Sequence, residues 1–348
     1  MGRAHRGPEA VAALPGLLGR RVALRYRSRG QTLTDAVGEL AAAGPEVVVV
    51  DARGGPVRID TDTVVAVREV PPARPKRPSW ATVARLEGIC ADGWPALVDR
   101  PLGQWRLRAA GGFTRRANAC LAIGDPGVPV PDALAEVRSF AAQHDVRPLA
   151  QVPEGSPWHA DVARQGWVPD ERHRAGWRVD VLVGELSGLA AAASGSPPDM
   201  TKVSIEGRER WRVAAVEPAT GPVDTVVNTE ARFNTEERFN TAQEHVLTAP
   251  ALPHLAFAVA RRGAELIGAA RLAVLDEHLY LTRLSVAEEH RRQGLATALM
   301  TAAARWAGAR GARWCVLQVA SHNTAALALY RRLGCTAHHR YLHLRPPG

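Results

Sequence analysis

Short apolar runs alternate with turn-forming residues along the first part of the chain. Apolar or alternating runs, the pattern of β-strands, occupy residues 21–26, 34–40, 46–50, 56–59 and 63–70. The segments between them, such as SRGQT and DARGG, are rich in residues that favour turns. Five short strands joined by tight turns predict a small and strongly bent β-barrel.

A proline-rich basic stretch follows these strands. Residues 71–78 read PPARPKRP, the composition of a stiff, polyproline-like linker. We therefore expect an SH3-like barrel over residues 17–70 and a linker over residues 71–79. Residues 1–16 are expected to be disordered.

Between residues 80 and 186 the pattern changes to mixed helices and strands. Helical periodicity is found in WATVARLEGICADGW, PDALAEVRSFAAQHD and WHADVARQGW, and Pro131 and Asp132 mark the start of the second of these. WRLRAA, RANACLAIG, VRPLAQVP and WRVDVLV have the pattern of strands. We expect an α/β lobe here, followed by a flexible linker over residues 187–200.

The last predicted domain covers residues 201–348. Its strands are LPHLAFAVA, AELIGAARLAVL, HLYLTRLSV, RWCVLQVA and YLHLR. A long alanine-rich helix, LATALMTAAARWAGARG, ends at Gly311, and a second helix runs from near Asn323 to Gly334. This alternation predicts a mixed α/β sheet domain.

A six-residue repeat interrupts the beginning of this domain. NTEARF, NTEERF and NTAQEH follow one another from Asn228 to His245. Solenoid proteins need longer units and more copies. We therefore expect a local duplication within a solvated surface helix, and the sequence assigns it no role.

The chain has a formal net charge of +9, and this charge is carried almost entirely by arginine. Lys76 and Lys202 are the only lysines, which together with abundant alanine, glycine and proline suggests the coding bias of a GC-rich genome. The charge alone is therefore poor evidence for nucleic-acid binding, although a basic surface favours anionic ligands. For the barrel, a nucleic-acid ligand stays an open alternative.

The four cysteines have no metal-binding or redox spacing. Cys90, Cys120, Cys315 and Cys335 are scattered along the chain, so we expect free, buried thiols in a reducing cytosol and no metal. No apolar stretch is long enough to span a bilayer, and the amino terminus makes a poor signal peptide. These observations predict a soluble, cytoplasmic protein without a membrane partner.

The turn before the long helix has the chemistry of an anion site. A helix start leaves free N–H groups that carry partial positive charge. Gly294 permits close backbone approach, Ala296 keeps the first turn open, and Arg291 and Arg292 add charge. Together they suit a diphosphate. The spacing is neither that of the P-loop nor that of the dinucleotide-binding GxGxxG.

This turn matches the pattern [RQ]-x-x-G-x-[GA] through Arg291, Gly294 and Ala296. An apolar strand precedes it, a long helix follows it, and NTAALALYRRLGC stands further on. In these features residues 245–345 resemble the GCN5-related N-acetyltransferases (GNATs). Cys335 replaces the more usual aromatic residue of the second motif.

The resemblance implies acetyl-CoA as co-substrate and assigns roles to single residues. Leu284 and Val286 would pair through their backbone with the acetyl and pantetheine part, and amides from Arg292 through Thr297 would hold the pyrophosphate. Tyr330 would protonate the departing thiolate. The expected contact residues are Leu284, Ser285, Val286, Arg291, Arg292, Gln293, Gly294, Leu295, Ala296, Thr297, Asn323 and Tyr330.

The general base is not evident from the sequence. Many relatives use a carboxylate on the strand that carries LSV, but HLYLTRLSV has none. Tyr280 stands near that position, and His278 shares its face of the strand. A water relay through Tyr280 or His278 is one hypothesis, and a plain strand-edge role for His278 is the alternative.

The middle lobe echoes the last domain in its order of strands and helices but lacks the glycine pattern of the anion site. We interpret residues 80–186 as a degenerate GNAT-like lobe that shapes the acceptor pocket. Arg115, Arg116 and Asn118 would bind an anion there, or they belong to a solvated hairpin turn.

The predicted fold is thus a mixed-sheet α/β GNAT fold in tandem behind a small SH3-like β-barrel. This arrangement resembles actinobacterial acetyltransferases described as short-type N-acetylglutamate synthases or as histone-like-protein acetyltransferases. The first resemblance implies transfer to the α-amine of glutamate and a role in amino-acid biosynthesis. The second implies lysine acetylation of a basic protein, with the barrel as docking module. The acceptor, the role of the barrel, and the choice between monomer and homodimer stay open.

Overall fold

The computed structural model describes residues 4–28, 32–51, 56–70, 78–173, 176–191, 201–210 and 240–347. The chain divides into two compact units, Met1–Lys76 and Arg77–Gly348. Most of the predicted repeat over residues 228–245, and the stretches 71–77 and 192–200 of the two predicted linkers, lie outside the described residues.

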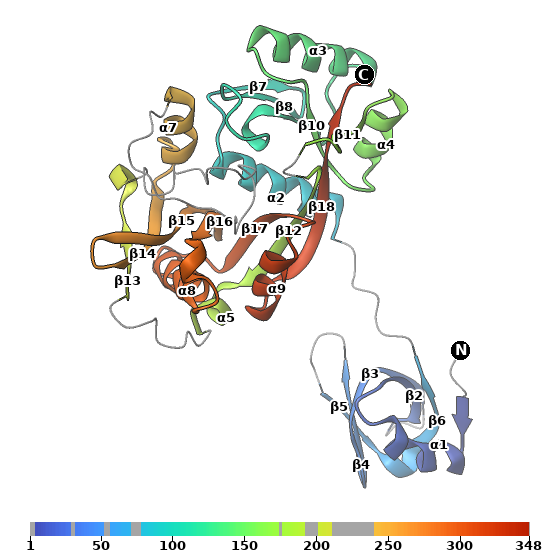
Figure 1. The fold of residues 1–348 in the computed structure, drawn as a ribbon. Coiled ribbons are helices and arrows are strands. Elements are labelled where there is room, and N and C mark those ends of the chain that lie inside the picture. The colour runs from blue at the N-terminus through green and yellow to red at the C-terminus, as the bar shows by residue number, and fades with distance from the viewer. Residues whose placement is uncertain are drawn as a thin grey trace. The chain divides into compact units, whose positions relative to one another are not determined.

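The first unit is a curved antiparallel sheet with one short helix beside it (Figure 1). Its strands follow the order β1-β6-β2-β3-β4-β5. The elements are β1 (Ala4–Arg6), α1 (Pro8–Ala13), η1 (Leu14–Leu17), β2 (Arg21–Arg27), β3 (Leu33–Ala43), β4 (Glu46–Asp51), β5 (Pro56–Asp60), η2 (Thr61–Thr63) and β6 (Val64–Glu69). The five strands predicted from the sequence are all present.

The start of this unit corrects one prediction. Residues 4–16 were expected to be disordered but form β1, α1 and part of η1, with β1 paired to β6. The reason is packing, because Ala10 and Leu14 lie one helical turn apart and are buried in the same core as Val22, Leu24 and Leu40. A single proline within a short apolar run did not outweigh this burial.

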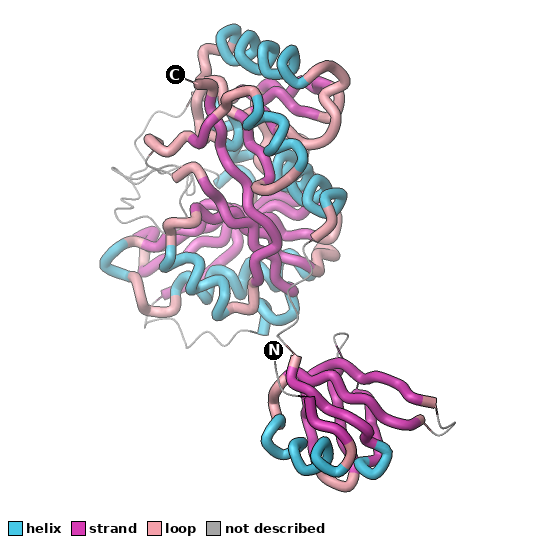
Figure 2. Tube along the Cα trace, turned by 90° about the vertical axis from the view of Figure 1, so that its right-hand side faces the viewer, coloured by secondary structure: helices cyan, strands magenta, loops and turns pink. Residues whose placement is uncertain are grey.

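The second unit is built on one large mixed sheet. Its strand order is β13-β14-β15-β16-β17-β12-β18-β10-β9-β8-β7, and β11 pairs with β18. We call residues 80–186 the middle lobe and residues 201–347 the C-terminal lobe. Figure 2 shows the strands of both lobes as one continuous band, so the two lobes share a sheet.

The middle lobe contains α2 (Trp80–Gly93), β7 (Val98–Leu102), β8 (Trp105–Ala109), η3 (Arg116–Asn118), β9 (Cys120–Leu121), α3 (Val130–Gln143), β10 (Ala150–Pro153), α4 (Pro157–Arg164), β11 (Val168–Pro169) and β12 (Arg178–Glu185). Helix α5 (Leu186–Ala191) follows directly. Leu186 and Leu189 of α5 are buried in the core of the C-terminal lobe. The predicted linker over residues 187–200 therefore begins as a packed helix.

The C-terminal lobe contains β13 (Thr201–Glu206), η4 (Arg208–Arg210), α7 (Thr241–Thr248), β14 (His254–Arg262), β15 (Glu265–Leu275), β16 (His278–Val286), η5 (Glu288–His290), α8 (Leu295–Gly308), β17 (Trp314–Ala320), α9 (Thr324–Arg332) and β18 (Thr336–Arg345). Helices α5, α8 and α9 share one hydrophobic core with the sheet. Helices α2 and α7 contribute to a second core. This core is formed by the side chains on the other face of the same strands.

The two lobes exchange their last strands. Strand β12 of the middle lobe pairs with β17 of the C-terminal lobe, from Val179 opposite Ala320 to Glu185 opposite Trp314. Strand β18 of the C-terminal lobe pairs with β10 of the middle lobe and with β12. Each lobe thus completes the sheet of the other. From the sequence the two lobes were expected to be separate domains, and this exchange was not predicted.

Candidate active site

Strands β16 and β17 separate in the middle of the C-terminal lobe. They are parallel and pair only from His278 opposite Trp314 to Tyr280 opposite Val316, although β16 continues to Val286 and β17 to Ala320. Beyond Tyr280 the backbone of β16 has no ladder partner on this side among the described strands. The opening leaves backbone donors and acceptors that an extended ligand can meet as an added strand.

A β-bulge lies in β16 where this opening begins. Arg271 pairs with Thr282, and the next pair joins Ala269 to Ser285, so β16 has one extra residue. Arg283 has a φ of 52°, in the left-handed region. Such a bulge bends the strand and redirects the side chains that follow it. Accordingly Leu284, after the bulge, faces the core of α8 and α9.

Hydroxyl groups around the opening lack partners. The buried hydroxyls of Thr282, Ser285 and Tyr330 form no hydrogen bond within the described part of the chain. Leaving such a group unmet in the interior costs about 1–3 kcal/mol each. Thr282 and Ser285 flank the bulge, which indicates a place where a ligand supplies the missing partners.

The turn before α8 has the predicted anion-site geometry. Gly294 is the N-cap of α8 with a φ of 81°, and Arg292 also has a positive φ, 62°. The first amide to donate within this helix is that of Ala298, to the Gly294 carbonyl at 3.0 Å. The amides from Arg292 through Thr297 have no acceptor among the described residues, so they are available to an anion.

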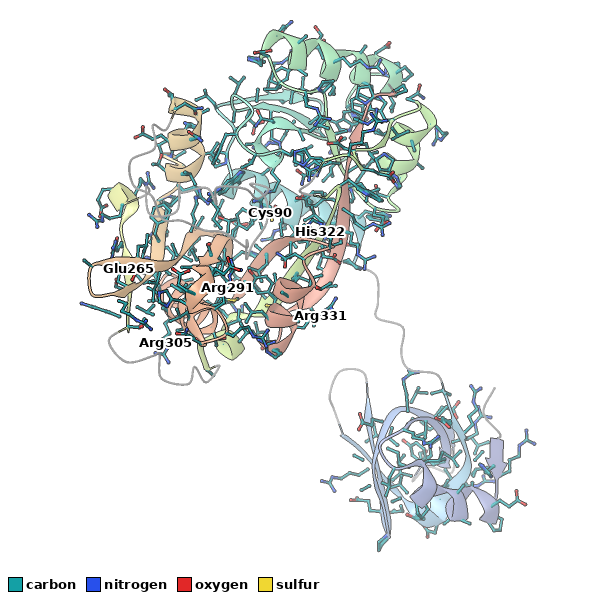
Figure 3. The ribbon with its side chains drawn as sticks, viewed as in Figure 1. Cys90, Glu265, Arg291, Arg305, His322 and Arg331 are labelled. Carbon is teal, nitrogen blue, oxygen red and sulfur yellow. The ribbon has the colours of Figure 1, made fainter. Side chains whose placement is uncertain are left out.

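The side chains of this turn brace it. Arg291 Nε donates to the Val286 carbonyl at 3.3 Å, which ties the turn to the end of β16. Gln293 Nε2 donates to the Glu289 carbonyl at 3.1 Å. Leu295 is buried in the core below. Figure 3 shows Arg291 beside α8.

Tyr330 and Asn323 both belong to α9. Asn323 is the N-cap of this helix, and its side chain accepts a hydrogen bond from the Ala326 amide at 3.1 Å. Tyr330 is fully buried, and burial raises the pKa of its phenol well above the ordinary value. The phenol therefore stays protonated at neutral pH.

Tyr280 faces the other side of the sheet and is already engaged. Its hydroxyl donates to Gln318 Oε1 at 2.7 Å and accepts from Arg116 Nη1 at 2.7 Å. Burial raises its pKa, which the nearby Arg116 partly opposes. Tyr280 therefore has the geometry of a positioning residue, not of a base.

His278 stands at the closed end of the opening. Burial lowers its pKa, and Arg85 adds to the shift. Its Nδ1 has no partner among the described residues. It lies on the part of β16 that still pairs with β17, which favours the strand-edge interpretation of this residue.

The segment around η3 is buried rather than solvated. Arg115, Arg116 and Asn118 each expose 6% of their surface, so the interpretation as a solvated hairpin turn is wrong. Asn118 holds the turn by accepting from the Ala110 amide at 2.7 Å, and Arg115 forms an ion pair with Asp170 at 3.6 Å. Only Arg116 reaches the opening between β16 and β17.

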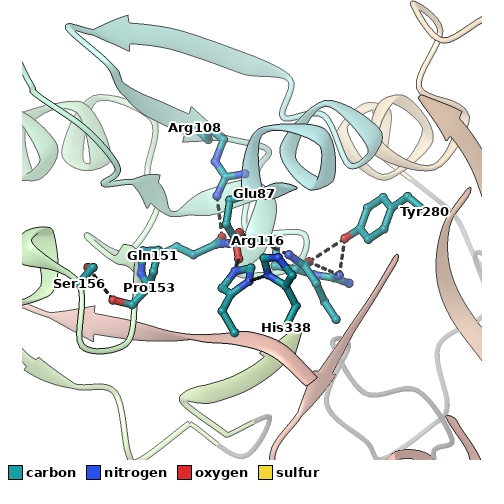
Figure 4. A network of polar contacts seen from close by, with 10 residues as sticks. Glu87, Arg108, Arg116, Gln151, Pro153, Ser156, Tyr280 and His338 are labelled. Atoms are coloured by element: carbon teal, nitrogen blue, oxygen red, sulfur yellow. Dashed lines mark hydrogen bonds and ion pairs between the residues drawn. The ribbon is translucent and has the colours of Figure 1, made fainter. Parts of the chain in front are cut away.

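Arg116 belongs to a polar network that joins the lobes (Figure 4). Arg108 Nη2 donates to Gln151 Oε1 at 2.8 Å, and Gln151 Nε2 donates to Glu87 Oε2 at 2.6 Å. Gln318 Nε2 lies 3.5 Å from the same carboxylate oxygen. Gln318 Oε1 accepts from Arg116 at 2.9 Å, which closes the connection to Tyr280.

Sequence reasoning missed most members of this network. One signal was present, because Glu87 lies on the buried stripe of α2 with Val83, Leu86 and Cys90. A carboxylate on an apolar helix stripe is rare unless it has buried partners. Gln318 and Gln151 gave no signal, since nothing in their local sequence shows which strands become neighbours.

Arginines gather around two aromatic rings on the same side of the sheet. The guanidinium groups of Arg116 and Arg271 lie 5.1 and 4.9 Å from the Trp94 ring centre, and that of Arg283 lies 5.9 Å from Phe113. Burial lowers the pKa of Arg271 to about 9, and the charges of Arg116 and Arg283 act in the same direction. These arginines give this side of the opening a positive character.

The cysteines are not suited to carry an acyl group. All four are free and buried. Burial raises the pKa of the thiols of Cys90, Cys120, Cys315 and Cys335, which disfavours the nucleophilic thiolate.

Among the described helices, none is long and apolar enough to cross a membrane.

Two relatives of known class align with this chain. It is 28% identical over 339 residues to the probable histone acetyltransferase Rv0428c of Mycobacterium tuberculosis (strain ATCC 25618 / H37Rv), covering 95% of this chain and 97% of the relative. It is 25% identical over 252 residues to the uncharacterized N-acetyltransferase YobR of Bacillus subtilis (strain 168), covering 72% of this chain and 94% of the relative.

A solved GCN5-related N-acetyltransferase from Kribbella flavida has a similar fold, with a TM-score of 0.51 and 20% identity over 76% of this chain and 95% of that one. Residues 17–68 match the Rv0428c N-terminal Sm-like domain, and residues 224–335 match the Acetyltransferase (GNAT) family. The predicted tandem α/β architecture behind a small β domain is confirmed. The chain thus carries a GNAT acetyltransferase domain over residues 224–335 and an Sm-like domain over residues 17–68.

Proposed function

We propose that this protein transfers the acetyl group of acetyl-CoA to the α-amine of glutamate. The observation that carries the proposal is the opening between β16 and β17 with its bulge, beside the turn that presents the amides from Arg292 through Thr297. Acetyl-CoA is the co-substrate of the GNAT family, and the residues present fit it. Backbone donors, unpartnered hydroxyls and a helix start meet at one edge of the sheet.

Different residues bind the pantetheine arm and the pyrophosphate of acetyl-CoA. The backbone of Leu284, Ser285 and Val286 pairs with the extended pantetheine arm. The amides from Arg292 through Thr297 bind the pyrophosphate, where Gly294 and Ala296 keep the approach open. Asn323 is the N-cap of α9, shortly after the end of β17, and contacts the pantetheine arm from the side of β17.

The chemistry needs no enzyme nucleophile. A neutral amine attacks the thioester carbonyl, and donors of the β16 backbone stabilise the oxyanion. Tyr330 then gives its proton to the departing thiolate, which its raised pKa permits, because the phenol is fully protonated at neutral pH.

The arginines favour an acceptor that bears carboxylates. Arg116 and Arg283 stand on the acceptor side of the opening, with Trp94 and Phe113 behind them. A planar guanidinium binds a carboxylate with two parallel hydrogen bonds. Glutamate offers two carboxylates next to a primary amine, whereas a lysine side chain in a basic protein would meet like charge.

A second candidate is lysine acetylation of a basic protein. It is favoured by the printed name of the M. tuberculosis relative, a probable histone acetyltransferase, and by the Sm-like domain as a docking module. The two candidates make opposite predictions for removal of residues 1–76. Turnover of a small acceptor should persist, because that unit has its own core, whereas docking-dependent protein acetylation should fall.

The experiment is a thiol-release assay with acetyl-CoA. L-Glutamate, L-glutamine, a diamine and a basic nucleoid protein are each offered as acceptor. L-Glutamine is the matched control, because it differs from glutamate only in the side-chain charge. Turnover of glutamate well above glutamine supports the proposal. Turnover of the basic protein alone would leave the second candidate.

A further inference from the structure

The acceptor amine must lose a proton, and β16 offers no carboxylate for it. Among the described residues, three carboxylates are buried: Glu87, Asp170 and Asp180. Asp170 pairs with Arg147, and Asp180 pairs with Arg340. The Glu87 side chain contacts Gln318 of β17, whereas the Asp180 side chain bonds to Ser321, just beyond the end of β17.

Glu87 is bonded to an imidazole on its other side. Its Oε1 lies 2.7 Å from His339 Nε2, and both side chains are almost fully buried, at 0% and 6% exposure. The other oxygen, Oε2, accepts from Gln151 at 2.6 Å. An ionised carboxylate can only accept hydrogen bonds, so Nε2 of His339 carries the proton. With its single proton on Nε2, His339 presents Nδ1 as an acceptor.

A second imidazole meets that acceptor because of a β-bulge in β18. His339 pairs with Val181 and Ala337 with Leu182, so His338 is the extra residue. Neighbouring side chains of a regular strand point to opposite faces, but here the two rings lie 5.0 Å apart at 77°. Their Nδ1 atoms are 2.7 Å apart.

The chain of hydrogen bonds has a defined direction. Because His339 Nδ1 is the acceptor, His338 Nδ1 is the donor, and His338 Nε2 is left with a lone pair. His338 is half-buried, so it is the member of the chain that water reaches. Burial and His339 together lower the pKa of His338 to about 4 against the opposing effect of Glu87, which keeps the imidazole neutral at neutral pH.

The inner end of this chain is tied to the opening. Gln318, Val181 and His339 form one row across β17, β12 and β18, and Glu87 reaches over that row from α2. Gln318 in turn holds Tyr280. The strand exchange is what brings β18 and its two histidines to this place. Figure 4 shows Glu87 and His338 in the same network of polar contacts.

We propose that Glu87, His339 and His338 form a proton relay that takes up the proton lost by the acceptor ammonium group before acetyl transfer. This inference rests on the proposed function. The N–H bond of the ammonium breaks, and water carries the proton to His338 Nε2. The proton on His338 Nδ1 passes to His339 Nδ1, so the gained charge rests on His339 beside the Glu87 carboxylate. The free amine then attacks, and the relay returns its proton to water.

The first test reads the proton positions and does not depend on activity. Long-range ¹H–¹⁵N spectra of the full chain at neutral pH report the tautomer of each histidine, and a His338→Ala variant assigns the pair. We expect the Nε2–H tautomer for His339 and the Nδ1–H tautomer, the minor form of free histidine, for His338. The Nε2–H tautomer at His338 would overturn the relay.

The second test reads the pH profile. Turnover is followed by thiol release with L-glutamate or the basic nucleoid protein, whichever is acetylated. Glu87→Gln keeps the shape of the side chain and is expected to lower kcat about 100-fold at neutral pH, with KM for acetyl-CoA unchanged. Asp161→Asn, a surface carboxylate of the same lobe, is the control and should have no effect.

His338→Ala covers the case in which Glu87→Gln does not fold, because His338 is half-exposed on a bulge. Its lost activity should return on addition of imidazole. If the wild type turns over and either variant, Glu87→Gln or His338→Ala, has the pH profile of the wild type, the relay is refuted. The proposed function is not affected by that result. If neither acceptor is acetylated, the proposed function fails and the tautomers alone decide whether the chain of hydrogen bonds exists as drawn.

Discussion

Replacing Tyr330 by phenylalanine separates catalysis from stability. The hydroxyl of Tyr330 is buried and has no hydrogen-bond partner within the described residues. Removing a buried, unpaired polar group relieves a desolvation cost of about 1–3 kcal/mol. We therefore expect Y330F to keep or raise the free energy of unfolding in the absence of ligand.

The effect on the reaction should have the opposite sign. General-acid catalysis by a positioned group contributes about 10²–10⁴-fold, which corresponds to roughly 3–5 kcal/mol at the transition state. Y330F should lose this factor in kcat, and KM for acetyl-CoA should change little, because the ring remains. The assays are thiol release for turnover and urea denaturation for stability.

Tyr280 provides the matched comparison. Its hydroxyl is buried to the same degree but makes two hydrogen bonds, to Gln318 and from Arg116. Y280F should therefore lose about 1–3 kcal/mol of stability, because Arg116 loses one of its acceptors and Gln318 loses a donor inside the protein. A Y330F variant that retains the kcat of the wild type would refute the general-acid role. A Y330F variant less stable than Y280F would refute the claim that its hydroxyl lacks a partner.

Three further changes test other parts of the structure. Gly294→Ala should raise KM for acetyl-CoA, whereas Gly311→Ala, with a similar φ of 85° at the far end of α8, should give a similar strain of about 1 kcal/mol and leave KM unchanged in the same assay. The free energy of unfolding should fall as the pH drops from 6.5 towards 4, because the pKa of His338 is lowered to about 4 in the folded state and the unfolded chain binds the extra proton. His338→Gln should flatten this decline in urea titrations. Because the ring is half-exposed, the change in stability should be smaller than the full pKa shift implies. Deleting residues 335–348 removes β18 and should unfold both lobes in a single thermal transition, because β10 and β12 lose the strand between them; a middle lobe that stays folded would contradict the exchange of strands.

Local sequence patterns predicted the elements well. The five strands of the Sm-like domain, the long helix before Gly311 and the turn at Gly294 are each encoded by neighbouring residues. Most of the expected acetyl-CoA contacts lie along one stretch of backbone, from Leu284 through Thr297, and the other two, Asn323 and Tyr330, belong to α9. Such features can be predicted from the local sequence alone, because they depend on hydrophobic periodicity, on a glycine where φ is positive and on the signals of a helix start.

Contacts between distant segments were not predictable in the same way. WRVDVLV was predicted as a strand of the middle lobe, and the structure pairs it, as β12, with β17 and β18 of the C-terminal lobe. A strand pattern shows which face is buried and not which strand lies beside it. For the same reason the link from Glu87 to His339 and Gln318 was invisible, since its members are more than two hundred residues apart.

The amino-terminal residues illustrate a smaller failure. Residues 1–16 were expected to be disordered, yet Ala10 and Leu14 are buried in the core of the Sm-like domain. Tertiary burial outweighed weak local propensity there. The anion site proposed around η3 failed in part for the opposite reason, because Arg115 and Asn118 are used to hold the chain.

The most direct test of the account is the product formed when the full-length protein is incubated with acetyl-CoA and an equal mixture of L-glutamate, L-glutamine and a basic nucleoid protein. Mass spectrometry identifies which amine is acetylated, and thiol release gives the CoA formed. The account predicts N-acetylglutamate in amounts equal to the CoA released, and loss of that product in Y330F. Acetylated lysines in the basic protein without N-acetylglutamate would contradict it.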